Sequence, residues 1–137
     1  MEDPERERER IVVADSNVLV RHAISDYLRH CGFSVIEASH AEDVLIILAH
    51  DSELGLKAVL CGADLQGGMN GFRLRASVRE IRPDLHVILS GSIEAAANAA
   101  AYICEEGPHL RRPYDPQGVV TYIRHLLARS RSPSPTA

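Results

Sequence analysis

The chain has 137 residues, 45% of them hydrophobic and 25% charged, which is the size and balance of one globular domain with one core. Its formal net charge of -4, with basic residues scattered among acidic ones, argues against nucleic-acid binding. The longest apolar run, residues 44–49, is far below the roughly 20 residues that cross a bilayer, and the charged N-terminus is unlike a signal peptide. We therefore expect a cytoplasmic protein that does not enter the membrane.

Short apolar runs alternate along the chain with helical patterns. Residues 1–10 alternate acids and arginines and predict a disordered tail. Strands are expected where apolar residues form short runs bounded by turn residues, namely at residues 11–14, 33–38, 58–61, 85–89 and around 109–111. Helices are expected where apolar residues recur every three or four positions, namely at residues 20–31, 42–50, 71–81, 93–105 and 117–128. Residues 130–137, rich in serine and proline, predict a flexible end.

This alternation of five strands with five helices predicts a parallel sheet with right-handed crossovers and helices on both faces. We expect one α/β domain over residues 11–129, with a flavodoxin-like (βα)5 fold and a five-stranded parallel sheet. In that class the strand order is commonly 2-1-3-4-5. The carboxyl ends of the first and third strands then meet, so Asp15 and the turn after Cys61 should face each other.

The turn after the third expected strand is the most informative segment of the chain. An apolar run ends there in the sequence CGADLQGGMNG, residues 61–71. A run of this length, too short for a helix, is typical of a buried parallel strand, and turns after such strands commonly carry the functional site. We expect the site at this turn.

Two segments resemble the receiver domains of bacterial response regulators. LQGGMNG (residues 65–71) is similar to the turn that follows the family's phosphate-accepting aspartate, and VVADSNVLVR (residues 12–21) is similar to its first strand and acidic pair. The resemblance places Gly62 at the acceptor position, so the aspartate that carries the phosphoryl group in the family is missing. It places Asp15 and Ser16 at the acidic pair, of which one member is thus neutral.

The other positions that the resemblance implies are also altered. Arg112, followed by proline, stands where the family has a lysine, and keeps the charge on a bulkier, forked side chain. The switch hydroxyl corresponds to Ser90, with Ser92 as a competitor, and the aromatic residue that moves with it corresponds to His109. We expect a degenerate phosphorylation pocket made of Asp15, Ser16, Gly62, Asp64, Ser90 and Arg112.

Asp64, two positions after Gly62, has two interpretations. It is either a solvated turn residue, or its carboxylate reaches the space that Gly62 leaves and lies opposite Asp15 and Arg112. Asp15 is likewise either a helix cap or a metal ligand. Receivers hold Mg2+ with three oxygen ligands, and here only Asp15 and Asp64 remain as carboxylates, so we expect weak Mg2+ binding at most and no other cofactor.

The leading hypothesis is a stand-alone, atypical receiver that acts as a protein-interaction module in bacterial two-component signalling, without an aspartyl phosphate. Phosphate-binding loops and catalytic triads are missing from the sequence, so we do not expect an enzyme. The expected partner is a histidine kinase, a phosphotransferase or another signalling protein. An alternative is a homodimer through the fourth helix, whose residues 95–101 are mostly alanine, the fifth strand and the fifth helix. With no room for an output module after residue 129, we expect the output to pass through a partner.

Two further functions stay open. The chain could accept phosphate on Asp64 or Asp15, or it could sense a small ligand or a redox change through Cys61, which is next to Gly62.

The three cysteines, Cys31, Cys61 and Cys104, are odd in number and far apart in the sequence. This pattern is typical of neither a disulfide framework nor a metal site. We expect all three to be buried as small hydrophobic side chains.

Overall fold

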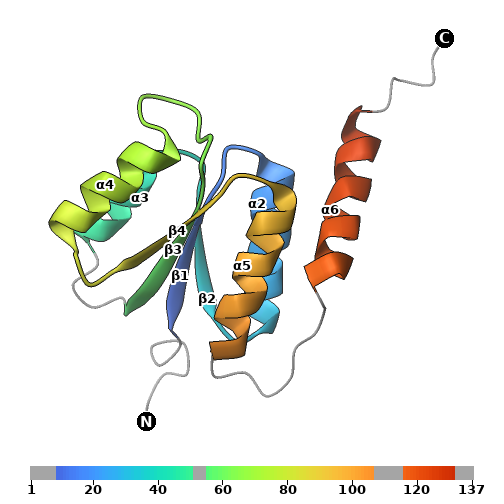
Figure 1. Ribbon diagram of the computed structural model, residues 1–137, viewed down its shortest axis with the longest axis horizontal. Helices are drawn as coiled ribbons and strands as arrows, with labels where there is room; N and C mark the ends of the chain where they lie inside the picture. The colour runs from blue at the N-terminus through green and yellow to red at the C-terminus, as the bar shows by residue number, and fades with distance from the viewer. Residues whose placement is uncertain (1–8, 51–54, 107–115, 132–137) are drawn as a thin grey trace.

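The computed structural model describes residues 9–50, 55–106 and 116–131. Within these ranges, four strands form one parallel sheet in the order β2-β1-β3-β4 (Figure 1). The strands are β1 (Arg10–Ala14), β2 (Ser34–Ala38), β3 (Leu56–Gly62) and β4 (His86–Ser90). The helices are α2 (Val18–His30), α3 (Ala41–Ala49), α4 (Gly71–Ile81), α5 (Ile93–Glu106) and α6 (Pro116–Arg131).

Helices cover both faces of the sheet, with α2 and α5 on one face and α3 and α4 on the other, while α6 packs against α2 and α5 (Figure 1). Successive residues of β1 point to opposite faces of the sheet, and helices cover both faces. The strand is therefore apolar on both sides after Arg10. Ile11 and Val13 join the core under α2 and α5, whereas Val12 and Ala14 join the core under α3 and α4. None of the helices in the described ranges is long and apolar enough to cross a bilayer.

The sheet differs from the sequence prediction in its number of strands. The described part of the chain contains four strands in the expected relative order, not five. The fifth expected strand, around residues 109–111, lies outside the described residues. Arg10, which the sequence placed in the tail, belongs to β1, because its backbone is in register with Ser34 of β2 and Leu56 of β3.

Capping residues set the helix starts. The Asn17 side-chain oxygen accepts hydrogen bonds from the backbone amides of Leu19 (2.9 Å) and Val20 (3.2 Å), so α2 begins two residues earlier than expected. Asn70 caps α4 through the amide of Arg73 (2.9 Å), and this helix has the expected bounds. The last helix continues to residue 131, into the segment expected to be flexible.

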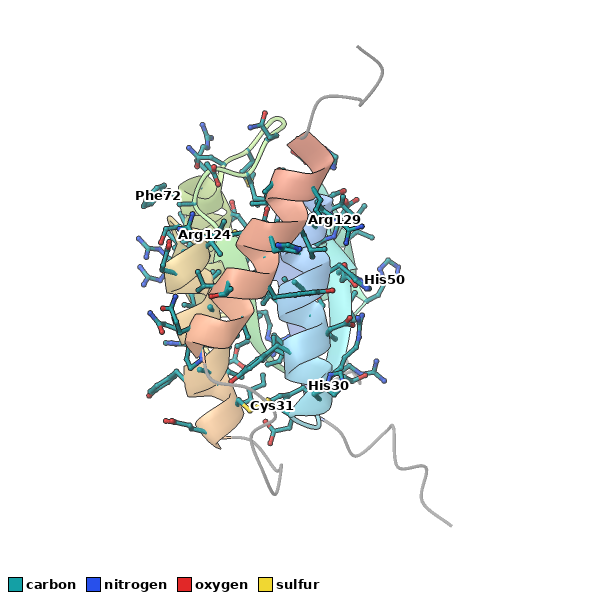
Figure 2. All side chains as sticks on the ribbon, turned by 90° about the vertical axis from the view of Figure 1, so that its right-hand side faces the viewer. His30, Cys31, His50, Phe72, Arg124 and Arg129 are labelled. Carbon is teal, nitrogen blue, oxygen red and sulfur yellow. A yellow bond between two sulfur atoms is a disulfide. The ribbon has the colours of Figure 1, made fainter. Side chains whose placement is uncertain are left out.

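A disulfide joins Cys31, the C-terminal cap of α2, to Cys104 near the end of α5 (Figure 2). The prediction that no cysteine is paired is therefore wrong for two of the three, and Cys61 is free and buried. The two partners are 73 residues apart, and the pairing is invisible in the sequence because only the parallel crossovers return the chain to the same face of the sheet.

Candidate functional site

The carboxyl ends of β1, β3 and β4 bring the predicted site residues together. Gly62 is in register with Ser90, and Asp15 directly follows Ala14, which is in register with Cys61. A pocket of about 210 Å³ opens at these strand ends. Its lining residues are Asp15, Asn17, Val20, Asp64, Ser90, Gly91, Ser92, Ile93 and Leu127.

Gly62 separates two carboxylates. A Cβ atom built on Gly62 would lie 3.5 Å from Oδ2 of Asp15 and 3.5 Å from Oδ1 of Asp64. Both distances are ordinary van der Waals contacts, so the two acidic side chains flank the position where the side chain of residue 62 would begin. The Asp64 carboxylate thus reaches the space that Gly62 leaves, while Asp64 remains exposed to solvent, and the expected position opposite Arg112 lies outside the described residues.

Asp15 is held in place by the turn that follows β1. Its Oδ1 accepts a hydrogen bond from the backbone amide of Asn17 (2.8 Å), and its carbonyl oxygen accepts one from Nη1 of Arg21 (3.0 Å). Burial raises the pKa of Asp15, and the negative charge of Asp64 raises it further, whereas the Asn17 amide and the Arg21 charge oppose the rise. The cap of α2 is Asn17, so Asp15 is not the helix cap that the sequence allowed.

Ser16 joins neighbouring loops instead of completing an acidic pair. Its Oγ accepts a hydrogen bond from the backbone amide of Gln66 (2.8 Å) and donates one to the carbonyl oxygen of Ser39 (3.4 Å). The loops after β1, β2 and β3 are therefore tied together by one hydroxyl. Asn17 was not predicted as the cap of α2, although asparagine is a common capping residue. The contact of Ser16 with Gln66 has no sequence signal, because every residue except proline has a backbone amide hydrogen.

The two candidate switch hydroxyls have different environments. Ser90 ends β4, is 7% exposed, and its Oγ donates to the carbonyl oxygen of Cys61 (3.5 Å). Ser92 precedes α5, and its Oγ accepts from the amide of Ala95 (3.0 Å), which is a helix-capping contact. Arg112 and His109, the other two predicted site residues, lie outside the described residues.

The free thiol of Cys61 lies close enough to Asp15 and Asp64 for their negative charges to act on it. Burial raises its pKa to about 12, with further contributions from the charges of Asp15 and Asp64. Its Sγ donates to the carbonyl oxygen of Gly62 (3.3 Å). A thiol in this environment stays protonated at neutral pH, and the thiolate is the reactive form. Burial and the two neighbouring charges therefore favour the thiol form of Cys61 over the thiolate, and redox sensing through Cys61 stays a prediction.

Gly71 lets the start of α4 approach the end of β3. Its amide donates to the carbonyl oxygen of Ala63 (3.2 Å). A Cβ at residue 71 would lie 2.4 Å from the carbonyl oxygen of Gly62 and 2.9 Å from Cα of Ala63. Since both contacts are with backbone, only glycine fits here, a requirement that the LQGGMNG segment alone does not reveal.

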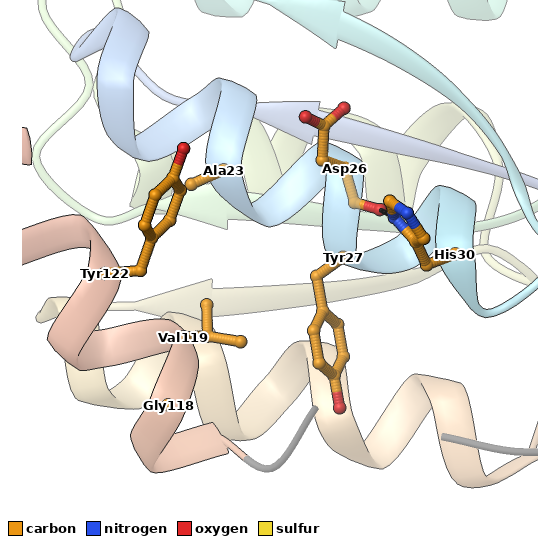
Figure 3. Close-up of a pocket in the computed structure, with 7 residues that line it drawn as sticks. All are labelled: Ala23, Asp26, Tyr27, His30, Gly118, Val119 and Tyr122. Atoms are coloured by element: carbon orange, nitrogen blue, oxygen red, sulfur yellow. Dashed lines mark hydrogen bonds between the residues drawn. The ribbon is translucent and has the colours of Figure 1, made fainter. Parts of the chain in front are cut away.

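A larger pocket, of about 490 Å³, lies between α2 and α6 (Figure 3). Ala23, Asp26, Tyr27, His30, Gly118, Val119 and Tyr122 line it. Asp26 is the acidic residue in this lining, and its carboxylate already pairs with Arg29 (3.2 Å) and with His22 (3.4 Å). None of its lining residues is shared with the pocket at the strand ends, so it does not extend that site.

Comparison with known proteins places this geometry in a known fold. The receiver domain of NtrX from Brucella abortus is 23% identical, with a TM-score of 0.54 over 89% of this chain and 99% of that one. The signal receiver domain of an HD domain-containing protein from Pseudomonas fluorescens Pf-5 is also 23% identical, with a TM-score of 0.57 over 93% of this chain and 100% of that one. The chain has the receiver fold. No model of a known protein family matches its sequence.

The sequence is also similar to a curated protein. The transcriptional regulatory protein AruR from Pseudomonas aeruginosa is 26% identical over 124 residues. The match covers 89% of this chain and 50% of that protein, so this chain spans about half the length of the relative.

Proposed function

We propose that this receiver fold serves as a protein-interaction module in two-component signalling and does not use an aspartyl phosphate. The observation that carries the proposal is Gly62 at the end of β3, where the resemblance to receivers places the acceptor aspartate. Glycine has no atom to which a phosphoryl group could be transferred. The proposed partners are a histidine kinase, a phosphotransferase or another signalling protein that recognises the receiver fold.

The residues at the strand ends do not fit an ordinary Mg2+ site. Asp15 and Asp64 are the two carboxylates that line the pocket, and one Asp15 oxygen already accepts the Asn17 amide. The Ser16 hydroxyl is engaged with Gln66. Among the described residues, no group of three or more His, Cys, Asp or Glu side chains could hold a metal ion. Because Mg2+ requires nearly octahedral oxygen coordination, we derive no step through it.

The alanine segment of α5 is not the exposed dimer surface that the sequence suggested. Ala96, Ala97, Ala100 and Ala101 are all buried in the core against α2 and the sheet. The large apolar side chain that α5 exposes is Tyr102, which is 59% exposed. Homodimerisation through α5 and α6 stays a prediction, and it would have to use this exposed side of α5.

A second candidate function is phosphorylation of Asp64. It is favoured by one observation, the approach of the exposed Asp64 carboxylate to the position of the missing side chain at Gly62. Asp15 is a poorer acceptor in this geometry, because one of its oxygens is bound to the turn.

Intact mass measurement after incubation with a small acyl phosphate and Mg2+ separates these functions. The proposal expects no phosphoryl adduct on the full chain. The variant Ser16→Asp/Gly62→Asp/Arg112→Lys restores the three positions that the resemblance marks as altered and is the matched positive control. An adduct on the unmodified chain that Asp64→Asn abolishes, and Asp15→Asn does not, would establish Asp64 as the acceptor and overturn the proposal.

A further inference from the structure

We infer that Cys31 and Cys104 form a reversible thiol–disulfide site, and that its oxidation state controls how firmly α5 is held against α2. Through α5 the site also acts on one wall of the pocket at the strand ends. The inference goes beyond the proposed function and does not depend on it.

The disulfide is the only covalent cross-link between the described residues of α2, which buries large side chains in this core, and α5, which buries mostly small ones. The α5 residues buried in this core are mostly alanines, with Ile103 as the large exception. Alanine methyl groups let two helices approach closely, and the Cα atoms of Cys31 and Cys104 are 5.6 Å apart. Burial of the alanine methyl groups also removes little apolar area from water. The α5 side of this contact therefore contributes mostly small side chains, and the covalent bond adds a constraint that they do not supply.

The small side chains of α5 also bear on how a reagent reaches the two sulfur atoms. Both cysteines are completely buried in the structure, with 0% exposure, so exchange requires α5 to separate locally from α2. Local opening costs least where few large apolar contacts are lost, which is the situation along the alanine face of α5. The sequence predicts a cytoplasmic protein, and in that reducing compartment disulfides are usually transient and redox-sensing.

The other end of α5 reaches the candidate functional site. Ser92 caps the first turn of α5, and both Ser92 and Ile93 line the pocket together with Asp15 and Asp64. The helix α5 is continuous over its 14 residues, so the local separation at its Cys104 end is passed along the helix. A displacement of its Cys104 end therefore changes the wall of the pocket at its first turn.

The chemistry is exchange with a small disulfide RSSR, such as oxidised glutathione. One cysteine thiolate attacks a sulfur of RSSR, which forms a mixed disulfide and releases RS−. The second cysteine thiolate then attacks the protein sulfur of that mixed disulfide and releases the second RS−. The two protons from the cysteines convert both RS− ions to RSH, so RSSR gains the two electrons that the protein loses.

Cys61 does not compete in this exchange. It lies in the other core, under α3 and α4, whereas Cys31 and Cys104 lie in the core under α2 and α5. It is free, and among the described residues no partner cysteine lies on its face of the sheet, so it provides an internal control for every thiol count.

The test equilibrates the native full chain in mixtures of reduced and oxidised glutathione, then quenches it with acid and alkylates it under denaturing conditions. Intact mass should show one alkylated cysteine at the oxidising end and all three at the reducing end, with one two-electron transition between them. Cys61→Ala should show the same transition with one label fewer. Cys31→Ala/Cys104→Ala should show none.

Hydrogen exchange on the same samples tests the coupling. Reduction should speed exchange about tenfold or more in α5 and at residues 90–93, with little change in α3. The inference is overturned if the pair is reduced only in denaturant, because the bond is then a permanent cross-link. It is also overturned if the reduced protein exchanges like the oxidised one at residues 90–93. Both readings come from the wild-type chain, so they stand even if the double variant does not fold.

Discussion

At the ends of β1 and β3, two neutral residues occupy positions where the resemblance to receivers places carboxylates. Ser16 uses its hydroxyl to hold the Gln66 amide, and Gly62 leaves room between Asp15 and Asp64. A full set of four carboxylates would repel strongly without a cation. With two of them, the repulsion is limited to a rise in the pKa of Asp15, to which burial contributes most.

Glu37 of β2 shows the opposite electrostatic effect. It pairs with Arg21 (3.1 Å), Arg29 (3.2 Å) and His22 (3.3 Å). Burial by itself would raise the pKa of Glu37, but the hydrogen bonds from these three partners outweigh it and lower the pKa below its ordinary value of 4.5. A carboxyl group whose pKa is lowered by folding stabilises the fold above its unfolded pKa, and that stabilisation is lost as the pH falls through the folded pKa.

We predict that Glu37→Gln lowers the free energy of unfolding by about 1 kcal/mol at pH 7, after allowance for solvent screening. The difference should shrink in acid and vanish once Glu37 is protonated in the wild type. Urea denaturation between pH 2 and 8 measures it. Glu80→Gln, an exposed position on α4, removes the same charge and should change stability little. A Glu37→Gln effect of equal size at every pH would show that the ion pairs are not its cause.

At the scale of elements, the start of α4 is fixed by two residues with different roles. Asn70 caps the helix through the Arg73 amide, which satisfies a backbone group that the helix itself leaves free. Gly71 allows the first turn to contact the backbone of Gly62 and Ala63. This close approach places the turn of residues 63–70, including Asp64, beside Asp15.

We predict that Gly71→Ala destabilises the protein by about 3 kcal/mol, because the added methyl group overlaps backbone atoms that have no rotamer to change. Gly91→Ala is the matched control, since a Cβ there meets nothing within 4 Å, and it should change stability by less than about 0.5 kcal/mol. Urea melts of both variants provide the measurement. Equal stability of the two variants would mean that α4 shifts without cost.

At the scale of the whole molecule, the disulfide closes a loop of 73 residues that includes β2, β3, β4, α3 and α4. Cross-linking removes conformational entropy from the unfolded chain, and the effect grows slowly with loop length. The bond therefore stabilises the domain as a whole, in addition to its local effect on α5.

We predict that the oxidised protein is more stable than the reduced one by about 4 kcal/mol, on the loop-entropy estimate. For a domain of this size this difference corresponds to a melting temperature about 15 °C higher. Calorimetry of the wild type with and without a thiol reductant measures the difference. The variant Cys31→Ala/Cys104→Ala should melt at one temperature in both buffers, and a shift of the same size in that variant would assign the effect to the reductant.

Local patterns in the sequence predict most of the architecture. The apolar runs indicate the four observed strands, and the alternation with helices predicts their parallel arrangement, while the relative order was taken from the flavodoxin-like class and agrees with the structure. The bounds of α4 match because its start and end signals, Asn70 with Gly71 and then Pro83, lie within a few residues of the helix. The positions of Asp15, Gly62 and Ser90 at one edge of the sheet follow from the same pattern, since each ends or directly follows a strand.

Contacts between distant segments depend on the tertiary structure alone. The hydrogen bond from Gln66 to Ser16 joins residues 50 positions apart, and the disulfide joins residues 73 apart. Neither has a local signal, because a backbone amide and a buried cysteine look the same in the sequence whether or not they are paired. Likewise the sequence left two interpretations open for Asp64, and only the tertiary structure shows that an exposed Asp64 also lies close to Gly62. Such contacts depend on where the crossovers return the chain, and that is settled by the packing of the two cores on either side of the sheet.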